Sequence, residues 1–276
     1  MQPSPTTVLD RRDWRSVINV AENQFDAVTK HRKNSVPAAL GQAKRRDMEP
    51  HDSDQSKKSS HKLTDPELWW AKYGEHYEGR DWTRYRGLIA EFVTHGREPP
   101  LLDVGCGYGF VLECARRFGI AAVGLEASET ARQRCNILHP LVDVRAWTGG
   151  EKLPLGTATV GGVVLNGFVD HITMDANRLL FSEIQRTLKP GGLVIVKSPS
   201  KYNRFDDDLG HVSFFSPTEF REFMRSFSFE IINQPYVVQP IFGETRLGSW
   251  AMRRVVKYWK PEKWAARIDL IARKPL

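Results

Sequence analysis

From residue 100 onward, short apolar runs alternate with segments whose apolar residues recur at helical spacing. Such alternation is typical of a parallel sheet covered by helices on both faces. The pattern therefore predicts an α/β fold built on a doubly wound sheet. Seven strands are expected, and their apolar centres are Leu101–Val104, Ala121–Leu125, Val142–Val144, Val163–Leu165, Leu193–Val196, Phe229–Ile232 and Ile268–Ala272.

The turn after the first strand contains three glycines. From Asp103 to Gly109 the chain reads Asp-Val-Gly-Cys-Gly-Tyr-Gly, between a strand and a helical segment. Glycines let a backbone turn tightly and let a ligand approach it closely, as in nucleotide sites. Phe110 stands where a dinucleotide site requires glycine, which disfavours NAD, and no Gly-Lys-Ser or Gly-Lys-Thr follows to form a phosphate-binding loop. The turn predicts another nucleotide-like ligand.

An acidic residue ends the second predicted strand. Glu126 follows Asp103 by 23 residues, which places its carboxylate at the carboxyl end of the neighbouring strand. A carboxylate at this point can accept hydrogen bonds from both hydroxyls of a ribose. The glycine turn and Glu126 together therefore favour a ligand that carries a ribose.

Several segments of the chain resemble class I S-adenosylmethionine-dependent methyltransferases of the small-molecule type. Asp103–Gly109 looks like the first motif of that family, and Val123–Ser128 looks like the segment with its ribose-binding acid. The similarity continues in order through Val163–Ile172, Glu183–Val196 and His211–Ser216. It covers about residues 63–232 together with the last strand.

The resemblance implies a Rossmann-like sheet of order 3-2-1-4-5-7-6, with strand 7 antiparallel and N-terminal lid helices. It also implies S-adenosyl-L-methionine as the cofactor, with Asp103 at the methionine amino group and Glu126 at the ribose. The family often has an acid for the adenine amino group after strand three, whereas here Trp147 is available to stack on adenine. The implied cofactor-binding residues are Asp103, Gly105, Cys106, Gly107, Gly109, Glu126, Ala127, Ala146, Trp147, Asn166 and Tyr77.

Two histidines are candidate catalytic residues. His171 and His211 follow strands four and five, on the side where an acceptor is expected to enter, and the carboxylate of Asp170 precedes His171. A histidine can take a proton from an oxygen nucleophile near neutral pH. Packing within a loop is the alternative role for each. The acidic run Asp206–Asp208 is interpreted as a solvated turn, and no metal site is expected.

The domain boundaries follow from composition. Residues 1–62 are polar, carry 12 basic and 8 acidic residues, and are predicted to be a disordered tail. Residues 63–276 are predicted to form the methyltransferase domain. Within that domain, 63–99 are expected to be lid helices that begin with a capping box, Thr64 to Glu67, and continue after the cap Asp81. Residues 233–267 are expected to form an insertion or cap that carries a basic amphipathic helix through Trp250 to Trp259.

These observations predict an enzyme that moves a methyl group to an oxygen or nitrogen of a small molecule: a metabolite, a sugar or a natural-product precursor. An RNA- or protein-directed methyltransferase is one alternative, favoured by the basic flanks, and a non-catalytic binding module with the same fold is another. Three cysteines cannot form a disulfide framework, and no apolar run approaches the ~20 residues of a membrane span. A cytoplasmic location is expected.

Overall fold

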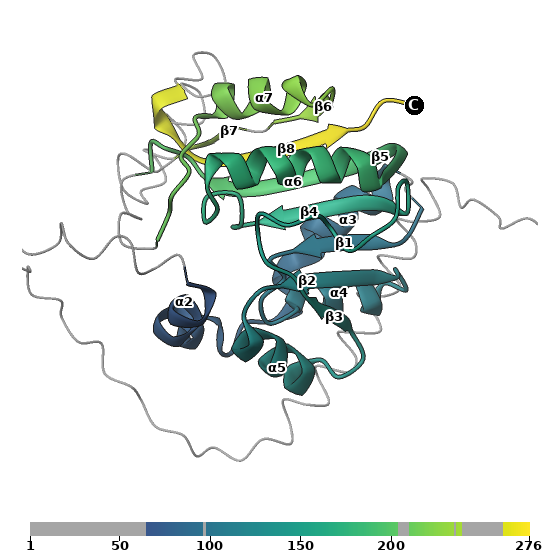
Figure 1. Cartoon of the computed structure of the whole chain (residues 1–276), viewed down its shortest axis with the longest axis vertical. Coiled ribbons are helices and arrows are strands. Elements are labelled where there is room, and N and C mark those ends of the chain that lie inside the picture. Colours follow the sequence, from purple (N-terminus) through teal and green to yellow (C-terminus); the bar gives the residue numbers. More distant parts are fainter. Residues whose placement is uncertain (1–64, 96–97, 204–209, 235, 239–261) are drawn as a thin grey trace, which may run out of the picture. The chain divides into compact units, whose positions relative to one another are not determined.

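The computed structural model describes residues 65–95, 98–203, 210–234, 236–238 and 262–276 (Figure 1). Several predictions lie outside these residues. They concern the tail 1–62, the cap Thr64, the run Asp206–Asp208 and the helix through Trp250 to Trp259.

The described residues form an eight-stranded sheet in the order β3-β2-β1-β4-β5-β8-β6, with β7 pairing on β8 (Figure 1). The first five strands are parallel, and β8 runs antiparallel to β5 and β6. The predicted order is confirmed, since β8 occupies the place of the seventh strand. The short β7 is an addition that the sequence pattern did not predict. The strands are β1 Leu101–Val104, β2 Ala122–Glu126, β3 Asp143–Ala146, β4 Val160–Asn166, β5 Leu188–Pro199, β6 Glu230–Asn233, β7 Tyr236–Val238 and β8 Ala265–Arg273.

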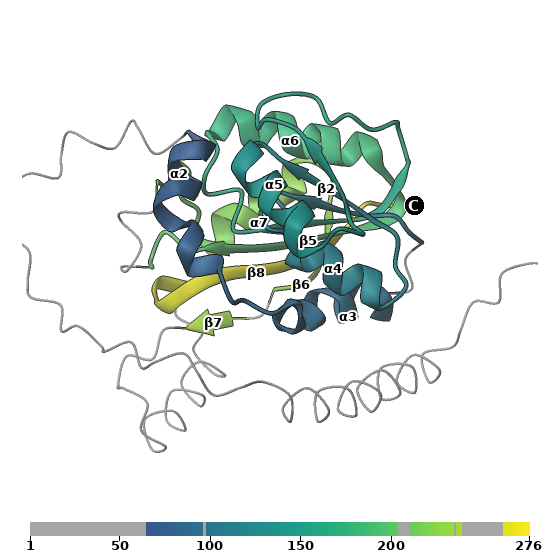
Figure 2. The ribbon, with the colours of Figure 1, turned by 90° about the horizontal axis from the view of Figure 1, so that it is seen from below.

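Helices cover both faces of the sheet (Figure 2). Helices α6 (Met174–Thr187) and α7 (Pro217–Ser226) pack on one face, where Phe181 and Phe220 are fully buried. Helices α3 (Arg86–Thr94) and α4 (Phe110–Arg117) contribute to a second core on the other face. The helix α5 (Glu129–Leu138) links β2 to β3.

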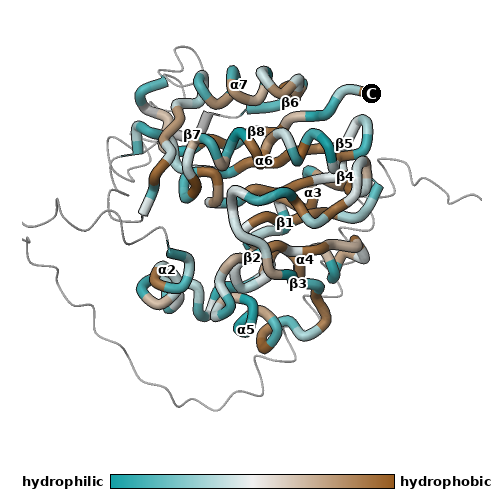
Figure 3. The backbone as a smooth tube through the Cα atoms, in the orientation of Figure 1, coloured by the Kyte–Doolittle hydropathy of each residue, from teal (hydrophilic) through white to brown (hydrophobic). Residues whose placement is uncertain are grey.

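The two cores follow from the alternation of side chains along each strand. Leu101 belongs to the core under α3 and α4, while its neighbour Leu102 belongs to the core under α6 and α7. Successive residues of a strand point to opposite faces, so a strand buried on both faces must be apolar throughout. All four residues of β1 are buried, and the strands form the apolar centre of Figure 3.

Short helices precede the sheet: α2 (Pro66–Tyr73), the 3-10 turns η2 (Gly74–Tyr77) and η3 (Trp82–Tyr85), and then α3. Asp65 is the N-cap of α2: its carboxylate accepts a hydrogen bond from the Glu67 N–H at 2.8 Å, and Pro66 takes the first turn. The cap Asp81 is confirmed, although the turn it caps is a 3-10 turn.

Helix α7 begins as the sequence predicts. Ser216 and Glu219 form a reciprocal capping box at its start. Within the described part of the chain, no helix is long and apolar enough to cross a membrane.

Candidate active site

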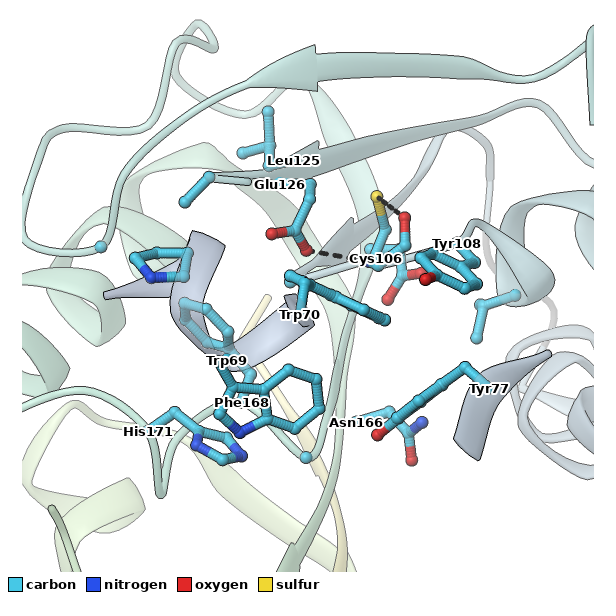
Figure 4. Close-up of a pocket in the computed structure, with 18 of the residues that line it drawn as sticks. Trp69, Trp70, Tyr77, Cys106, Tyr108, Leu125, Glu126, Asn166, Phe168 and His171 are labelled. Carbon is cyan, nitrogen blue, oxygen red and sulfur yellow. Dashed lines mark hydrogen bonds between the residues drawn. The ribbon is translucent and has the colours of Figure 1, made fainter. Parts of the chain in front are cut away.

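A cavity of about 250 Å³ opens at the carboxyl ends of β1, β2 and β4, against α2 and η2 (Figure 4). Parallel strands bring their carboxyl ends to one edge of a sheet, so residues far apart in sequence meet there. Ten of the residues predicted for the site line this cavity: Tyr77, Asp103, Gly105, Cys106, Gly107, Glu126, Ala127, Trp147, Asn166 and His171.

The glycine turn forms the floor of the cavity. Gly105 and Gly107 have φ values of +70° and +52°, in the left-handed region that side chains disfavour. A Cβ on Gly107 would lie 2.7 Å from a ring carbon of Trp70. Glycine is therefore required at this position both by the backbone conformation and by the close approach of the indole.

Glu126 connects the two loops at the floor of the cavity. Its Oε2 accepts a hydrogen bond from the Gly107 N–H at 2.9 Å, and its Oε1 accepts one from the Ser128 N–H at 2.9 Å. The pKa of Glu126 is raised by burial, although these hydrogen bonds and one from Trp70 act against the shift. A carboxylate has about four lone-pair sites, so beside these three donors one site remains to accept a hydrogen bond from a ligand.

Asp103 lies at the end of β1, beside this carboxylate. Its side chain is buried, and its Oδ2 has no hydrogen-bond partner among the described residues. Burial, followed by repulsion from Glu126, raises the pKa of Asp103 to about 8. A buried acceptor without a donor is costly, and it is found where a ligand supplies the donor.

Aromatic side chains of α2 cover the glycine turn. The Trp70 ring stacks on Tyr108 with ring centroids 4.5 Å apart, and Trp70 is 9% exposed. The helix is attached to α5 where the Glu67 carboxylate accepts a hydrogen bond from the Glu129 N–H, and the segment after η2 is attached where Glu78 pairs with Arg134. Figure 4 shows Trp70 beside Glu126 and Trp69 beside His171.

The far end of the cavity is formed by Trp147 after β3 and by the loop after β4. The Trp147 ring lies 6.1 Å from the Phe168 ring, and its Nε1–H donates a hydrogen bond to the Lys152 carbonyl. Asn166, Gly167 and Phe168 also line this end. The two rings provide an apolar wall that a flat ligand group can contact.

Asp170 and His171 of the loop after β4 form a cluster with His211, which lies in the segment between β5 and α7. Oδ2 of Asp170 lies 3.0 Å from Nε2 of His211 and 3.5 Å from Nε2 of His171. Burial alone would raise the pKa of Asp170, but the two histidines outweigh burial and hold this pKa below its usual value. The structure therefore brings together both predicted catalytic histidines, although they are 40 residues apart in sequence.

Three residues of the predicted site do not line the main cavity. Gly109 caps α4, and Ala146 ends β3. His211 contacts the cluster but not the main cavity, and together with Asp170 it borders a second and much smaller pocket. Cys106 lines the cavity, but burial raises the pKa of its thiol well above the usual value, so the thiol stays protonated near neutral pH.

Other residues of the cavity were not assigned to it from the sequence. Phe110 follows the glycine turn and Phe168 lies within the segment Val163–Ile172, but no pattern indicated that their rings face the cavity. Trp70 belongs to the predicted lid segment 63–99, from which only Tyr77 was assigned to the site. Cavity residues outside the predicted set include Trp69, Trp70, Arg80, Tyr85, Tyr108, Phe110, Thr148, Phe168 and Ile172.

Comparisons with known proteins agree with this geometry. Residues 102–196 match the family described as "Methyltransferase domain". A probable S-adenosylmethionine-dependent methyltransferase of Mycolicibacterium smegmatis is 29% identical over 123 residues, which are 44% of this chain and 46% of that protein. N-demethylindolmycin N-methyltransferase of Streptomyces griseus is 32% identical over 119 residues, 41% of this chain and 49% of that protein. The chain thus matches about half the length of these curated relatives.

Solved structures share the fold at low sequence identity. A SAM-dependent methyltransferase from Archaeoglobus fulgidus aligns with a TM-score of 0.54 and 20% identity over 75% of this chain and 98% of its own. A putative methyltransferase in complex with the Haloferax volcanii Trm112 activator aligns with a TM-score of 0.58 and 18% identity over 78% and 98%. Residues 102–196 thus match a methyltransferase domain, and the described fold is the one these solved methyltransferase structures share. The relative from Mycolicibacterium smegmatis is described as S-adenosylmethionine-dependent.

Proposed function

We propose that this chain transfers the methyl group of S-adenosyl-L-methionine to an oxygen or nitrogen of a small molecule. The observation that carries the proposal is the pair of buried carboxyl groups, Asp103 and Glu126, on either side of the glycine turn in an open cavity. Both have acceptor capacity left over for a ligand.

The residues present fit the cofactor. Asp103 would receive the methionine ammonium group, because a cation removes the cost of a buried acceptor that has no donor. Glu126 would accept one ribose hydroxyl through its remaining lone pair, and a second hydroxyl would replace the hydrogen bond from Trp70. Gly105 and Gly107 would form the floor under the ligand, beside the Phe168 and Trp70 rings that pack against them.

The adenine would occupy the end of the cavity formed by Trp147, Phe168 and Asn166. Stacking on an aromatic ring holds a flat base without requiring an acidic partner. This assignment accounts for the absence of an acid in the segment from Arg145 to Thr148. Ala127, also in the lining, leaves room beside the ribose.

When bound, the cofactor supplies an electrophilic methyl carbon on a sulfonium. The chain's own contribution is to hold an acceptor in line with that carbon, and positioning of this kind supplies several kcal/mol of the barrier. The acceptor would enter beside His171, which lines the cavity and has a carboxylate, Asp170, to orient it. His171 is placed to take the proton that an acceptor hydroxyl or amine loses.

Two features support a small acceptor. Trp69, Tyr77 and His171 enclose the cavity on the side of α2, which favours a compact molecule with some apolar surface. In addition, the relative from Streptomyces griseus is named for N-methylation of demethylindolmycin, a small molecule.

The proposal is tested by radiometric methyl transfer. The full chain is incubated with methyl-labelled S-adenosylmethionine and separate pools of hydroxylated metabolites, sugars, amines, bulk RNA and protein. Label should appear in a small-molecule pool, and Asp103→Asn should abolish the transfer. Label in RNA or protein alone would contradict the small-molecule acceptor, and label in no pool, from a protein that binds the cofactor, would favour a binding module.

A further inference from the structure

We propose that Asp170, His171 and His211 form a binding site for one divalent metal ion of the zinc type at the acceptor end of the cavity. The predicted absence of a metal site was based on local sequence patterns, and this cluster joins residues from two separate loops. Binding of the ion does not depend on the proposed function, whereas its use in activating the acceptor rests on that function.

The spacing of the ligand atoms fits one ion. Each of the three residues offers one ligand atom, and these atoms all lie within 4.8 Å of one another. The two histidine nitrogens are 3.0 and 3.5 Å from the same carboxylate oxygen. Ligands about 2.0–2.2 Å from a tetrahedral zinc ion are roughly 3.4 Å apart. Only small side-chain rotations are therefore needed for all three atoms to contact one ion.

The orientation of the carboxylate also fits an ion. The Asp170 side chain is 4% exposed, and its Oδ2 faces both imidazoles and is paired with Nε2 of His211. Its other oxygen, Oδ1, accepts a hydrogen bond from the Ser198 hydroxyl at 3.0 Å. One oxygen is held in place while the other points into the cluster. Metal-ligating carboxylates are oriented in this way by a second hydrogen bond.

The two loops that supply the ligands are fixed to each other. The Asp170 carbonyl accepts hydrogen bonds from the N–H groups of Val212 and Ser213, at 2.8 and 3.1 Å. The Ser213 hydroxyl donates to the Ile172 carbonyl at 2.6 Å. A metal site built on such cross-linked loops requires little reorganisation when the ion binds.

The ligand set indicates the class of metal. Two imidazoles and one carboxylate suit zinc and leave a fourth tetrahedral position for water or substrate, as in catalytic zinc sites. His171 borders the large cavity, and the Trp69 ring lies 5.5 Å from its imidazole. On the other side, the Phe214 ring lies 6.2 Å from that of His211. The Trp69 ring thus shields the cluster on the cavity side, while Phe214 is 56% exposed.

An ion at this position would act on the acceptor. A hydroxyl bound to zinc has a lowered pKa, and its proton passes to water. Both imidazoles would then serve as ligands, and the ion would replace His171 in promoting loss of the proton. Methyl transfer would consequently persist below the pH at which a free histidine base becomes protonated.

The test measures metal binding directly. Full-length protein without a polyhistidine tag is treated with chelator and titrated calorimetrically with Zn²⁺, and the visible absorption of a Co²⁺ complex is recorded to report the ligand geometry. We expect one ion per chain at the described cluster and a Co²⁺ spectrum of tetrahedral intensity. Asp170→Asn and His211→Gln, which preserve size, should each weaken zinc binding at least about 100-fold.

His76→Gln is the matched control, because His76 is exposed and lies outside the cluster. It should bind zinc as the wild-type protein does. Zinc should also raise the melting temperature of the wild-type and His76→Gln proteins, but not that of the two cluster variants. Equal zinc affinity in all four proteins, or no binding to the wild type, would overturn the proposal.

Binding of S-adenosylhomocysteine is measured on the same samples. Cofactor binding without zinc binding would refute the metal site and leave the proposed function intact. Zinc binding without cofactor binding would support the metal site while contradicting the proposed function.

Discussion

The backbone N–H of Gly107 donates a hydrogen bond to Oε2 of Glu126 at 2.9 Å. This contact fixes the turn after β1 against the end of β2, so that the carboxylate both shapes the glycine turn and faces the cavity. A substitution at either residue is therefore expected to affect cofactor binding through the same loop.

Glu126→Ala should weaken binding of S-adenosylhomocysteine tens-fold. The ribose would lose a contact to a carboxylate worth about 1.5–3 kcal/mol. Calorimetric titration measures this change, and Glu222→Ala on the exposed side of α7 is the control that should bind normally. Unchanged affinity in a folded Glu126→Ala protein would refute the ribose assignment.

Gly107→Ala should destabilise the protein and abolish cofactor binding. The new methyl group would occupy a left-handed backbone position and collide with the Trp70 ring. Gly87→Ala in α3 is the matched control: a Cβ there meets no atom within 4 Å, so the helix should gain about 0.4–1 kcal/mol. Urea unfolding and calorimetry follow both variants. Normal binding by Gly107→Ala would show that the cofactor does not lie on this turn.

Asp103 should make the stability of the ligand-free protein depend on pH. Its pKa rises from 3.8 to about 8 on folding, so the native state keeps a proton that the unfolded chain has lost. This contribution is complete below about pH 4 and is lost as the pH rises through about 8. Between these values, the free energy of unfolding of Asp103→Asn should fall less steeply than that of the wild type. Urea unfolding from about pH 5 to pH 9 measures both curves, and parallel curves would contradict the raised pKa.

The sequence predicted the fold, and ten residues that line the cavity, because their signals are local. The apolar strand runs, the glycine turn and Glu126 can each be recognised from a few neighbouring residues of the sequence. The sheet order that the resemblance implied is confirmed. The short β7 has no such signal, since three residues that pair only at one end of β8 show no periodicity.

The other residues of the site are placed by tertiary contacts, so the sequence alone could not predict their positions. Trp70 reaches Gly107 because α2 is attached to α5 through Glu67, a contact between residues 62 positions apart. The approach of His211 to Asp170 likewise depends on hydrogen bonds between two loops. Sequence spacing indicated each histidine singly, but it could not indicate that both face one carboxylate oxygen.

Asn177 is expected to be a positioning residue for the loop after β4. Its buried amide donates to the carbonyls of Val169 at 2.7 Å and Ile172 at 3.3 Å, which flank Asp170 and His171. Asn177→Ala leaves the Val169 carbonyl without this donor and leaves the Ile172 carbonyl with the Ser213 hydroxyl alone, so it should cost about 1–3 kcal/mol of unfolding free energy and lower methyl transfer. Urea unfolding and activity measurements should show both losses, whereas Arg178→Ala, at an exposed position of the same helix, should show neither.

Calorimetric titration of the full chain with S-adenosylhomocysteine, with NAD as the comparison ligand, tests the central claim most directly. The account predicts one site with a micromolar Kd for S-adenosylhomocysteine, loss of that site in Asp103→Asn, and no binding of NAD. Binding of NAD, or a folded protein that binds neither ligand, would contradict it.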